Sequence, residues 1–119
     1  MNLVRLAGIL GFVGVAFGAF GAHFLRGRVG ESLIEVWKTG VLYHLVHAVA
    51  LLALAALGAR AGRIRIVAGL FLAGILVFSG SLYLLVLTGE RRLGAVTPLG
   101  GVAFLLGWLV LFASAKKPT

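Results

Sequence analysis

The stretch that decides the fold is residues 39–59, TGVLYHLVHAVALLALAALGA, which contains no charged side chain. A helix rises about 1.5 Å per residue, so roughly 20 residues cross the roughly 30 Å hydrocarbon layer of a bilayer. Because that layer offers no water to the peptide groups, such a segment must satisfy its backbone hydrogen bonds internally as a helix. Residues 39–59 therefore predict a transmembrane helix.

Similar apolar stretches occur on both sides of this segment, and the composition agrees with them. The 119 residues are 61% apolar and 12% charged, contain no cysteine and have a mean hydropathy of +1.14. A soluble domain of this size needs a more polar exterior, and a disulfide scaffold needs cysteines. We therefore predict one transmembrane domain over residues 1–119, an all-α integral membrane four-helix bundle with up-down-up-down topology and helices near 3–25, 39–59, 66–88 and 97–115.

Two local patterns refine the ends of these helices. Within residues 29–38, Val29, Leu33 and Trp37 fall on one side of a helix and charged residues on the other, which predicts a short interfacial helix between helices 1 and 2. Thr97 followed by Pro98 is typical of an N-cap and a first helical residue. Helix 4 is therefore expected to begin near Thr97.

The net charge of +8 is spread over both ends of the predicted helices. A nucleic-acid surface needs its basic groups on one solvent-exposed face, so we expect no nucleic-acid partner. The end with both termini carries six Lys or Arg residues and the opposite end five, a small excess that favours cytoplasmic termini. We expect the lipid bilayer itself to be the partner, with anionic headgroups near Arg60, Arg63 and Arg65.

Small residues are placed where helices need to approach each other. In lipid, apolar burial does not drive helix association, and close backbone contact at small residues contributes instead. Glycines recur at steps of three or four in helix 1, and Gly100 and Gly107 lie about two turns apart in helix 4. The predicted packing residues are Gly8, Gly11, Gly14, Gly18, Gly100 and Gly107.

Polar side chains inside the predicted spans gather at one depth. Intramembrane polar groups are costly and tend to face the interior of a bundle. Alternating helix directions place these groups in the same half, which we assign to the outer leaflet. The residues predicted to line a ligand-binding pocket there are His23, Thr39, Tyr43, His44, His47, Ser79, Ser81, Tyr83 and Thr97.

The chemistry of this predicted pocket stays open. His23, His44 and His47 could supply three nitrogens to zinc or copper, although no cysteine or intramembrane carboxylate completes the set. No motif specifies a cofactor, and no HExxH, GxSxG or phosphate-binding loop indicates an enzyme. Small multidrug exporters have a similar length and helix number, but they use a carboxylate in helix 1, which this chain lacks.

The segments Gly18–His23, Thr39-Gly40 with Tyr43 and His47, Phe78–Tyr83, and Thr97-Pro98 with Gly107-Trp108 together resemble the YgdD-like family of small uncharacterised membrane proteins. The matching segments lie in all four predicted helices. The resemblance implies a four-helix protein of the bacterial cytoplasmic membrane and implies no established activity. His44 falls outside the matching motifs.

Two classes of function follow as hypotheses. The first is a binding module in which the predicted pocket holds a small ligand, a lipid or a metal ion. The second is a structural or accessory subunit, in which the polar groups lock the helices and glycine-rich faces dock another copy or a larger membrane complex. A transporter or enzyme that uses His47 and Tyr43 ranks behind both, because Glu35 is the sole acidic residue near them.

Overall fold

The protein is described by a computed structural model that covers residues 2–116. Four helical segments in that range are long and apolar enough to cross a membrane: Leu3–Leu25, Glu31–Ala61, Ile64–Thr88 and Arg91–Ser114. The prediction of an all-α protein with four transmembrane helices is confirmed.

The first two spans differ in regularity. Span one consists of α1 (Leu3–Ala16), a π-helical turn η1 (Phe17–Gly21) and α2 (Ala22–Leu25). Span two is the uninterrupted α3 (Glu31–Leu57) followed by a 3-10 turn η2 (Gly58–Ala61). The longest helix of the protein is therefore α3, which carries two histidines. Its α-helical hydrogen bonding is uninterrupted from Glu31 to Leu57.

The third and fourth spans repeat this contrast. Span three consists of α4 (Ile64–Gly74), a second π-helical turn η3 (Ile75–Ser79) and α5 (Gly80–Thr88). Span four opens with a 3-10 turn η4 (Arg91–Ala95) and continues as α6 (Thr97–Ser114). A π turn adds a residue to one helical turn and redirects nearby backbone groups.

Two helix ends have residues that cap them. The side chain of Asn2 accepts a hydrogen bond from the backbone N–H of Arg5 at 2.8 Å, which caps the start of α1. Gly89 ends α5 in the left-handed region, with φ 73°, and donates its N–H to the carbonyl of Leu85. Glycine reaches this backbone conformation without steric cost.

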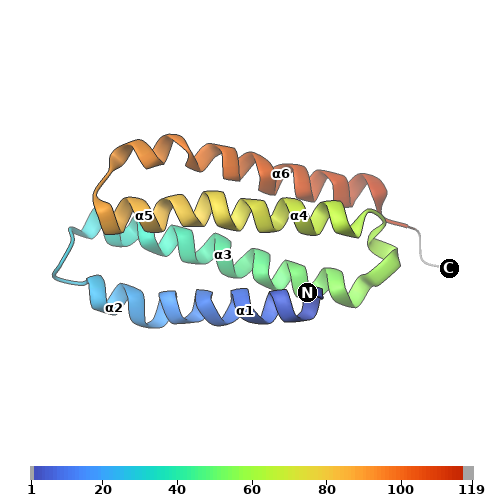
Figure 1. The fold of residues 1–119 in the computed structure, drawn as a ribbon, viewed down its shortest axis with the longest axis horizontal. Helices are drawn as coiled ribbons and strands as arrows, with labels where there is room; N and C mark the ends of the chain where they lie inside the picture. The colour runs from blue at the N-terminus through green and yellow to red at the C-terminus, as the bar shows by residue number, and fades with distance from the viewer. Residues whose placement is uncertain (1, 117–119) are drawn as a thin grey trace.

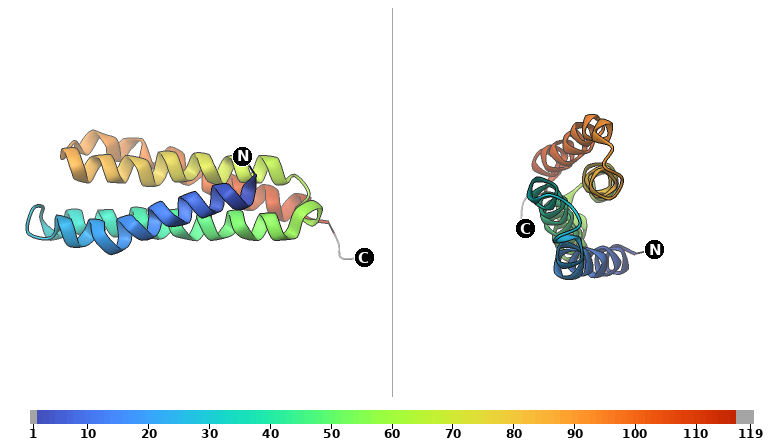
Figure 2. Two further views of the ribbon diagram at one scale, coloured as in Figure 1. Left: turned by 60° about the horizontal axis from the view of Figure 1, so that its bottom comes forward. Right: turned by 90° about the vertical axis from the view of Figure 1, so that its left-hand side faces the viewer.

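Consecutive spans run in opposite directions and lie side by side (Figure 1). α3 packs along α1 on one side and along the third span on the other, and α6 packs along α4 and η3. The end-on view in Figure 2 shows the resulting order α1, α3, third span and α6. Both termini and the α3–α4 connection lie toward one end of the bundle, called here the terminal end, and the other two connections form the opposite end.

The interfacial helix expected over residues 29–38 is not a separate element. α3 begins at Glu31 and passes through this segment without a break. Nothing between Lys38 and Val41 interrupts the helix, since Gly40 is accommodated within it and no proline is present. The same continuity places Glu35, Thr39 and Tyr43 along one helix.

The start of the fourth helix also differs in detail from the expectation. Thr97 is the first residue of α6 and is preceded by Val96 in helical conformation, so Thr97 does not act as the N-cap. Its hydroxyl lies 2.6 Å from the hydroxyl of Ser81 in α5. The 3-10 turn η4 lies directly before this helix, and no side chain caps the start of α6.

Two apolar clusters fill the interior. One lies in the half toward the terminal end and contains Ala7, Ala50, Leu51, Leu54, Ala61, Val67, Ala68, Phe71, Ile75 and Phe104. The other lies toward the opposite end and contains Ala22, Leu25, Trp37, Val41, Tyr83 and Val86. Hydrogen bonds between spans that involve side chains lie beside both clusters and at the terminal end.

Candidate functional site

His44 joins three of the four spans through its two ring nitrogens. Its Nε2 lies 2.8 Å from the carbonyl oxygen of Leu10 in α1, and its Nδ1 lies 2.8 Å from the hydroxyl of Tyr83 in α5. Because a carbonyl can only accept, Nε2 carries the proton and donates to Leu10, and the Tyr83 hydroxyl donates to Nδ1. His44 is only 3% exposed, so these bonds form away from competing water.

Glycines allow these rings to reach their partners. A Cβ at Gly14 would lie 2.6 Å from Cδ2 of Leu45 and 3.3 Å from Cδ2 of His44. A Cβ at Gly40 would lie 3.0 Å from the ring of Tyr83. Both positions therefore need the smallest residue for α1, α3 and α5 to approach as closely as they do.

The two π-helical turns mark further contacts with α3. Ser79, the last residue of η3, is fully buried and donates its hydroxyl to the carbonyl of Gly40 at 2.6 Å. Trp37 donates its indole N–H to the carbonyl of Phe17, the first residue of η1, at 2.9 Å. The indole ring fills the space above Gly21, where a Cβ would lie 2.6 Å from Cζ2 of Trp37. Each π turn thus adjoins a side-chain hydrogen bond to α3.

His47 links α3 to α6 with the opposite tautomer. Its Nδ1 donates to the carbonyl of Tyr43 at 2.8 Å, and its Nε2 accepts the indole N–H of Trp108 at 3.0 Å. An indole nitrogen can only donate, so Nε2 of His47 must be the unprotonated nitrogen. The imidazole also stacks on Phe104, with ring centroids 3.7 Å apart and planes 13° from parallel.

A groove of about 450 Å³ opens beside His47, between α3 and α6. Its rim is formed by Val102, 50% exposed, and Leu105, 70% exposed, on the outer surface of the bundle. Tyr43 is 41% exposed, and its hydroxyl takes part in none of the hydrogen bonds found within residues 2–116. The residues that line the groove are Tyr43, His47, Phe78, Pro98, Gly101, Val102, Phe104, Leu105 and Trp108.

The nine residues predicted for one pocket are divided among several places. His44, Ser79 and Tyr83 are buried between spans, and Tyr43 and His47 line the groove. The other four lie elsewhere: Ser81 and Thr97 bond to each other, Thr39 donates to the carbonyl of Glu35, and His23 is exposed near the end of the first span. One continuous cavity does not connect the predicted set.

The structure does not bring the three histidines together. His44 and His47 lie one turn apart on α3 but face different neighbours, and His23 is exposed on α2. Within residues 2–116, no group of three His, Asp or Glu side chains is arranged to hold a metal ion. Both nitrogens of His44 and of His47 already have hydrogen-bond partners within the protein.

The predicted packing glycines fall into two groups. A Cβ would press into a neighbouring helix at Gly14, Gly18, Gly100 and Gly107. At Gly107 the added Cβ would lie 2.5 Å from Cε1 of Phe71. The ring of Phe71 in α4 therefore packs directly against the backbone of α6 at this position. Gly8 and Gly11 face open space, with nothing within 4 Å of an added Cβ.

The two tryptophans were not among the predicted site residues. Trp37 was expected in the interfacial belt, but it is 4% exposed and packs against Phe17 and Tyr83. Trp108 lies well inside α6, far from the ends where tryptophan is usually enriched. An indole N–H at that depth needs a hydrogen-bond acceptor. This requirement could have predicted from the sequence that Trp108 bonds to a polar group of another helix.

Comparison with known proteins gives a consistent result. Residues 17–101 match the family described as "Protein of unknown function (DUF423)". The chain belongs to this family. The matched range includes His44, His47, Ser79 and Tyr83, whereas Trp108 lies beyond it.

Relatives of similar length align over nearly the whole chain. The chain is 44% identical to the UPF0382 membrane protein YwdK of Bacillus subtilis over 117 residues, which covers 96% of this chain and 95% of the relative. It is 40% identical to the UPF0382 membrane protein SAB0533 of Staphylococcus aureus, with 98% of each chain covered. No solved structure matches the chain. The protein thus belongs to a family of membrane proteins of unknown function.

Proposed function

We propose that this DUF423 protein is a binding module that holds a lipid-soluble small molecule in the groove between α3 and α6. The observation that carries the proposal is the groove itself, about 450 Å³ in volume and lined by five aromatic or imidazole rings. Ligand sites in proteins commonly enclose about 300–1,000 Å³ and combine an apolar lining with a few polar groups. This groove has the size and the composition of such a site.

The lining supports a particular class of ligand. Phe78 and Phe104 offer apolar ring faces, and the hydroxyl of Tyr43 is a free donor beside them. His47 offers no free nitrogen, since Trp108 and the backbone occupy both. The groove therefore suits a largely apolar molecule with one hydrogen-bond acceptor, such as a carbonyl group, placed against Tyr43.

The rim supports entry from the bilayer. Val102 and Leu105 are exposed on the surface that faces acyl chains when the four spans are embedded in a membrane. A ligand dissolved in the bilayer could enter sideways between them without crossing a polar barrier.

Filling the groove tests this proposal. A Cβ at Gly101 would meet only the Phe78 ring at 3.8 Å, so Gly101→Leu places its side chain in the groove without a backbone clash. Gly69→Leu is the matched control, because its Cβ has nothing within 4 Å and the residue is exposed on α4. Native mass spectrometry of protein purified in mild detergent should find a co-purified molecule in the wild type and in Gly69→Leu, and lose it in Gly101→Leu. Identical spectra for all three proteins would reject the proposal.

A second candidate function is self-association through α1, as part of a structural assembly. α1 packs along α3 alone among the long helices, and its Gly8 and Gly11 face open space beside the exposed Phe12. Small residues on a free helix face allow close contact with a second helix, and we propose a second copy of this chain as the occupant.

The absence of cysteine from the sequence makes this second candidate simple to test. Phe12→Cys introduces a single thiol on the α1 face, and Phe112→Cys is a control at a residue 85% exposed on α6. Oxidation in native membranes should yield a disulfide-linked dimer with Phe12→Cys and little with Phe112→Cys. Monomers with both variants would exclude the α1 interface.

The proposal also includes the setting of the protein. We place it in the cytoplasmic membrane with both termini in the cytoplasm, on the small excess of basic residues at the terminal end. The narrower resemblance to YgdD-like proteins is part of the same proposal and is supported by the motif residues quoted above.

The orientation can be tested by labelling. A membrane-impermeant maleimide applied to intact cells should label Glu90→Cys and leave Arg60→Cys unlabelled; the reverse pattern would invert the orientation.

A further inference from the structure

The terminal end of the bundle is basic and has no acidic side chain. It carries Arg5 near the start of α1, Arg60 and Arg63 between α3 and α4, Arg65 in the first turn of α4, and Lys116 after α6. All three acidic residues of the chain, Glu31, Glu35 and Glu90, belong to the opposite end. The charge at the terminal end must therefore be balanced by something other than the side chains of this protein.

At the opposite end, acidic side chains lie near basic ones. Lys38 lies 3.5 Å from Glu35, and Arg92 lies 3.9 Å from Glu90. Within residues 2–116, these are the ion pairs that the structure contains, and both are exposed. The opposite end thus pairs part of its positive charge within the chain, whereas the terminal end has basic side chains alone and attracts external anions.

The α3–α4 connection is fixed against the end of α6. Gly62 has φ 76°, and a Cβ there would lie 2.7 Å from the carbonyl carbon of Ser114, so only glycine fits this contact. The backbone N–H of Arg63 donates to the Ser114 hydroxyl at 3.4 Å, and Lys116 donates its N–H to the carbonyl of Arg60 at 2.9 Å. These contacts hold the basic residues in a defined arrangement.

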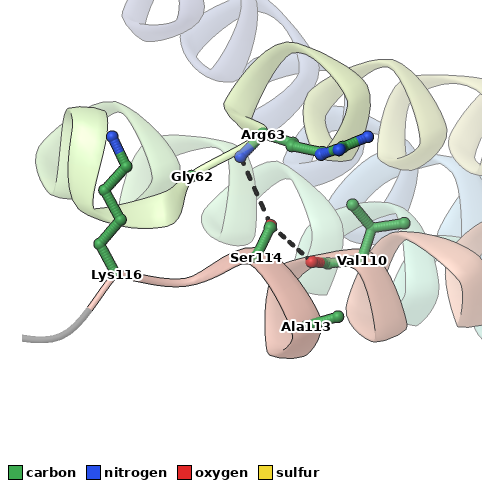
Figure 3. A pocket seen from close by; sticks show the side chains of 6 residues that line it. All are labelled: Gly62, Arg63, Val110, Ala113, Ser114 and Lys116. Atoms are coloured by element: carbon green, nitrogen blue, oxygen red, sulfur yellow. Dashed lines mark hydrogen bonds between the residues drawn. The ribbon is translucent and has the colours of Figure 1, made fainter.

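A hollow of about 620 Å³ lies at this junction and is lined by Gly62, Arg63, Val110, Ala113, Ser114 and Lys116. The side chains of Arg63 and Lys116 stand on either side of Ser114 (Figure 3). Val110 and Ala113 form an apolar wall in the direction of the membrane-spanning part of α6. The hollow therefore combines two cations at its ends with an apolar surface along one side.

The start of α4 adds to the positive potential. α4 has eleven residues, begins at Ile64, has no side-chain cap and has no acidic residue in its first turn. The first backbone N–H groups of a helix carry partial positive charge and bind anions when no side chain caps them. Because Arg63 both precedes α4 and lines the hollow, this helix end lies next to the Arg63 side of the hollow.

We propose that the hollow binds the phosphate headgroup of an anionic phospholipid, with an acyl chain along Val110 and Ala113. The guanidinium of Arg63 and the ammonium of Lys116 hold the phosphate oxygens, and the nearby start of α4 adds to the positive potential. The apolar wall distinguishes a phospholipid from free phosphate, which has nothing to place against it. This site is separate from the groove between α3 and α6 and does not depend on it.

Lipid retention tests the proposal. The purified full-length protein is reconstituted with an equimolar mixture of phosphatidylglycerol and phosphatidylcholine, extracted in mild detergent and analysed by native mass spectrometry. The test variant is Arg63→Gln/Lys116→Gln, and the control is Arg26→Gln/Arg91→Gln, which removes the same charge from exposed residues at the opposite end. Arg63→Lys keeps the charge, and circular dichroism checks that every variant is helical.

The wild type, the control and Arg63→Lys should retain phosphatidylglycerol in preference to phosphatidylcholine. Each basic side chain near an anionic headgroup contributes about a fivefold preference, so the double variant should lose about 25-fold. Equal loss in the control, or no preference in the wild type, would overturn the proposal. Displacement of the bound lipid by inorganic phosphate at about 10 mM would also overturn it, because the site would then recognise phosphate alone.

Discussion

Replacing Gly100 by alanine is expected to push α6 away from the third span. The added Cβ would lie 2.7 Å from Cα of Phe78 and closer still to its amide nitrogen, where ordinary contacts begin at 3.4 Å. The obstacle is backbone, which cannot rotate aside as a side chain can, so the helices must separate by more than about 0.7 Å. A gap of roughly 0.5–1 Å costs a quarter to a half of each dispersion contact across the interface.

The magnitude follows from these two opposing effects. Overpacking of a close interface costs about 1–3 kcal/mol, and this site belongs at the upper end because the clash is with main chain. Alanine in place of glycine within a helix returns about 0.5–1 kcal/mol. We expect Gly100→Ala to lower the free energy of unfolding by about 2 kcal/mol.

The neighbouring Gly101 provides the control. Its added Cβ would meet only the Phe78 ring, at 3.8 Å, so Gly101→Ala should be neutral or slightly stabilising. The difference is measured by thermal unfolding of both variants in the same detergent, followed by circular dichroism at the helical minimum of about 222 nm. Equal stability of the two variants, or a more stable Gly100→Ala, would refute the reasoning.

Three further predictions concern hydrogen bonds between spans. Tyr83→Phe leaves a buried imidazole nitrogen without its donor and should cost about 1 kcal/mol in a detergent unfolding assay, whereas Tyr43→Phe should change stability by less than about 0.5 kcal/mol. A double-mutant cycle with Ser81→Ala and Thr97→Val should give a coupling energy of about 0.6 kcal/mol for their 2.6 Å contact; additive effects would show that the contact contributes nothing. Trp37→Phe keeps a ring above the first span but removes its indole N–H, and should cost about 1 kcal/mol with no change in helix content by circular dichroism.

The structure brings together some of the residues predicted for the site and separates others. Periodicity along one helix identified Tyr43 and His47 as neighbours, because a helical repeat fixes which residues share a face. It could not reveal that His44 reaches Leu10 in α1, since the partner is a backbone carbonyl that any residue would supply. Nor could it reveal the contact between His47 and Trp108, which are separated by sixty-one positions in the sequence.

What the sequence by itself determined is the number of helices long and apolar enough to cross a membrane. This number follows from segment length and hydrophobicity, because a peptide group in hydrocarbon must satisfy its hydrogen bonds within a helix. Only the tertiary structure decided which polar side chains have hydrogen-bond partners within the protein and which have none. In a bilayer, lipid tails are as apolar as the helices, so hydrophobicity does not select the faces that pack; the fit of Gly14, Gly100 and Gly107 against opposing side chains and backbone does. That fit closed the interior around His44 and left Tyr43 open on the groove.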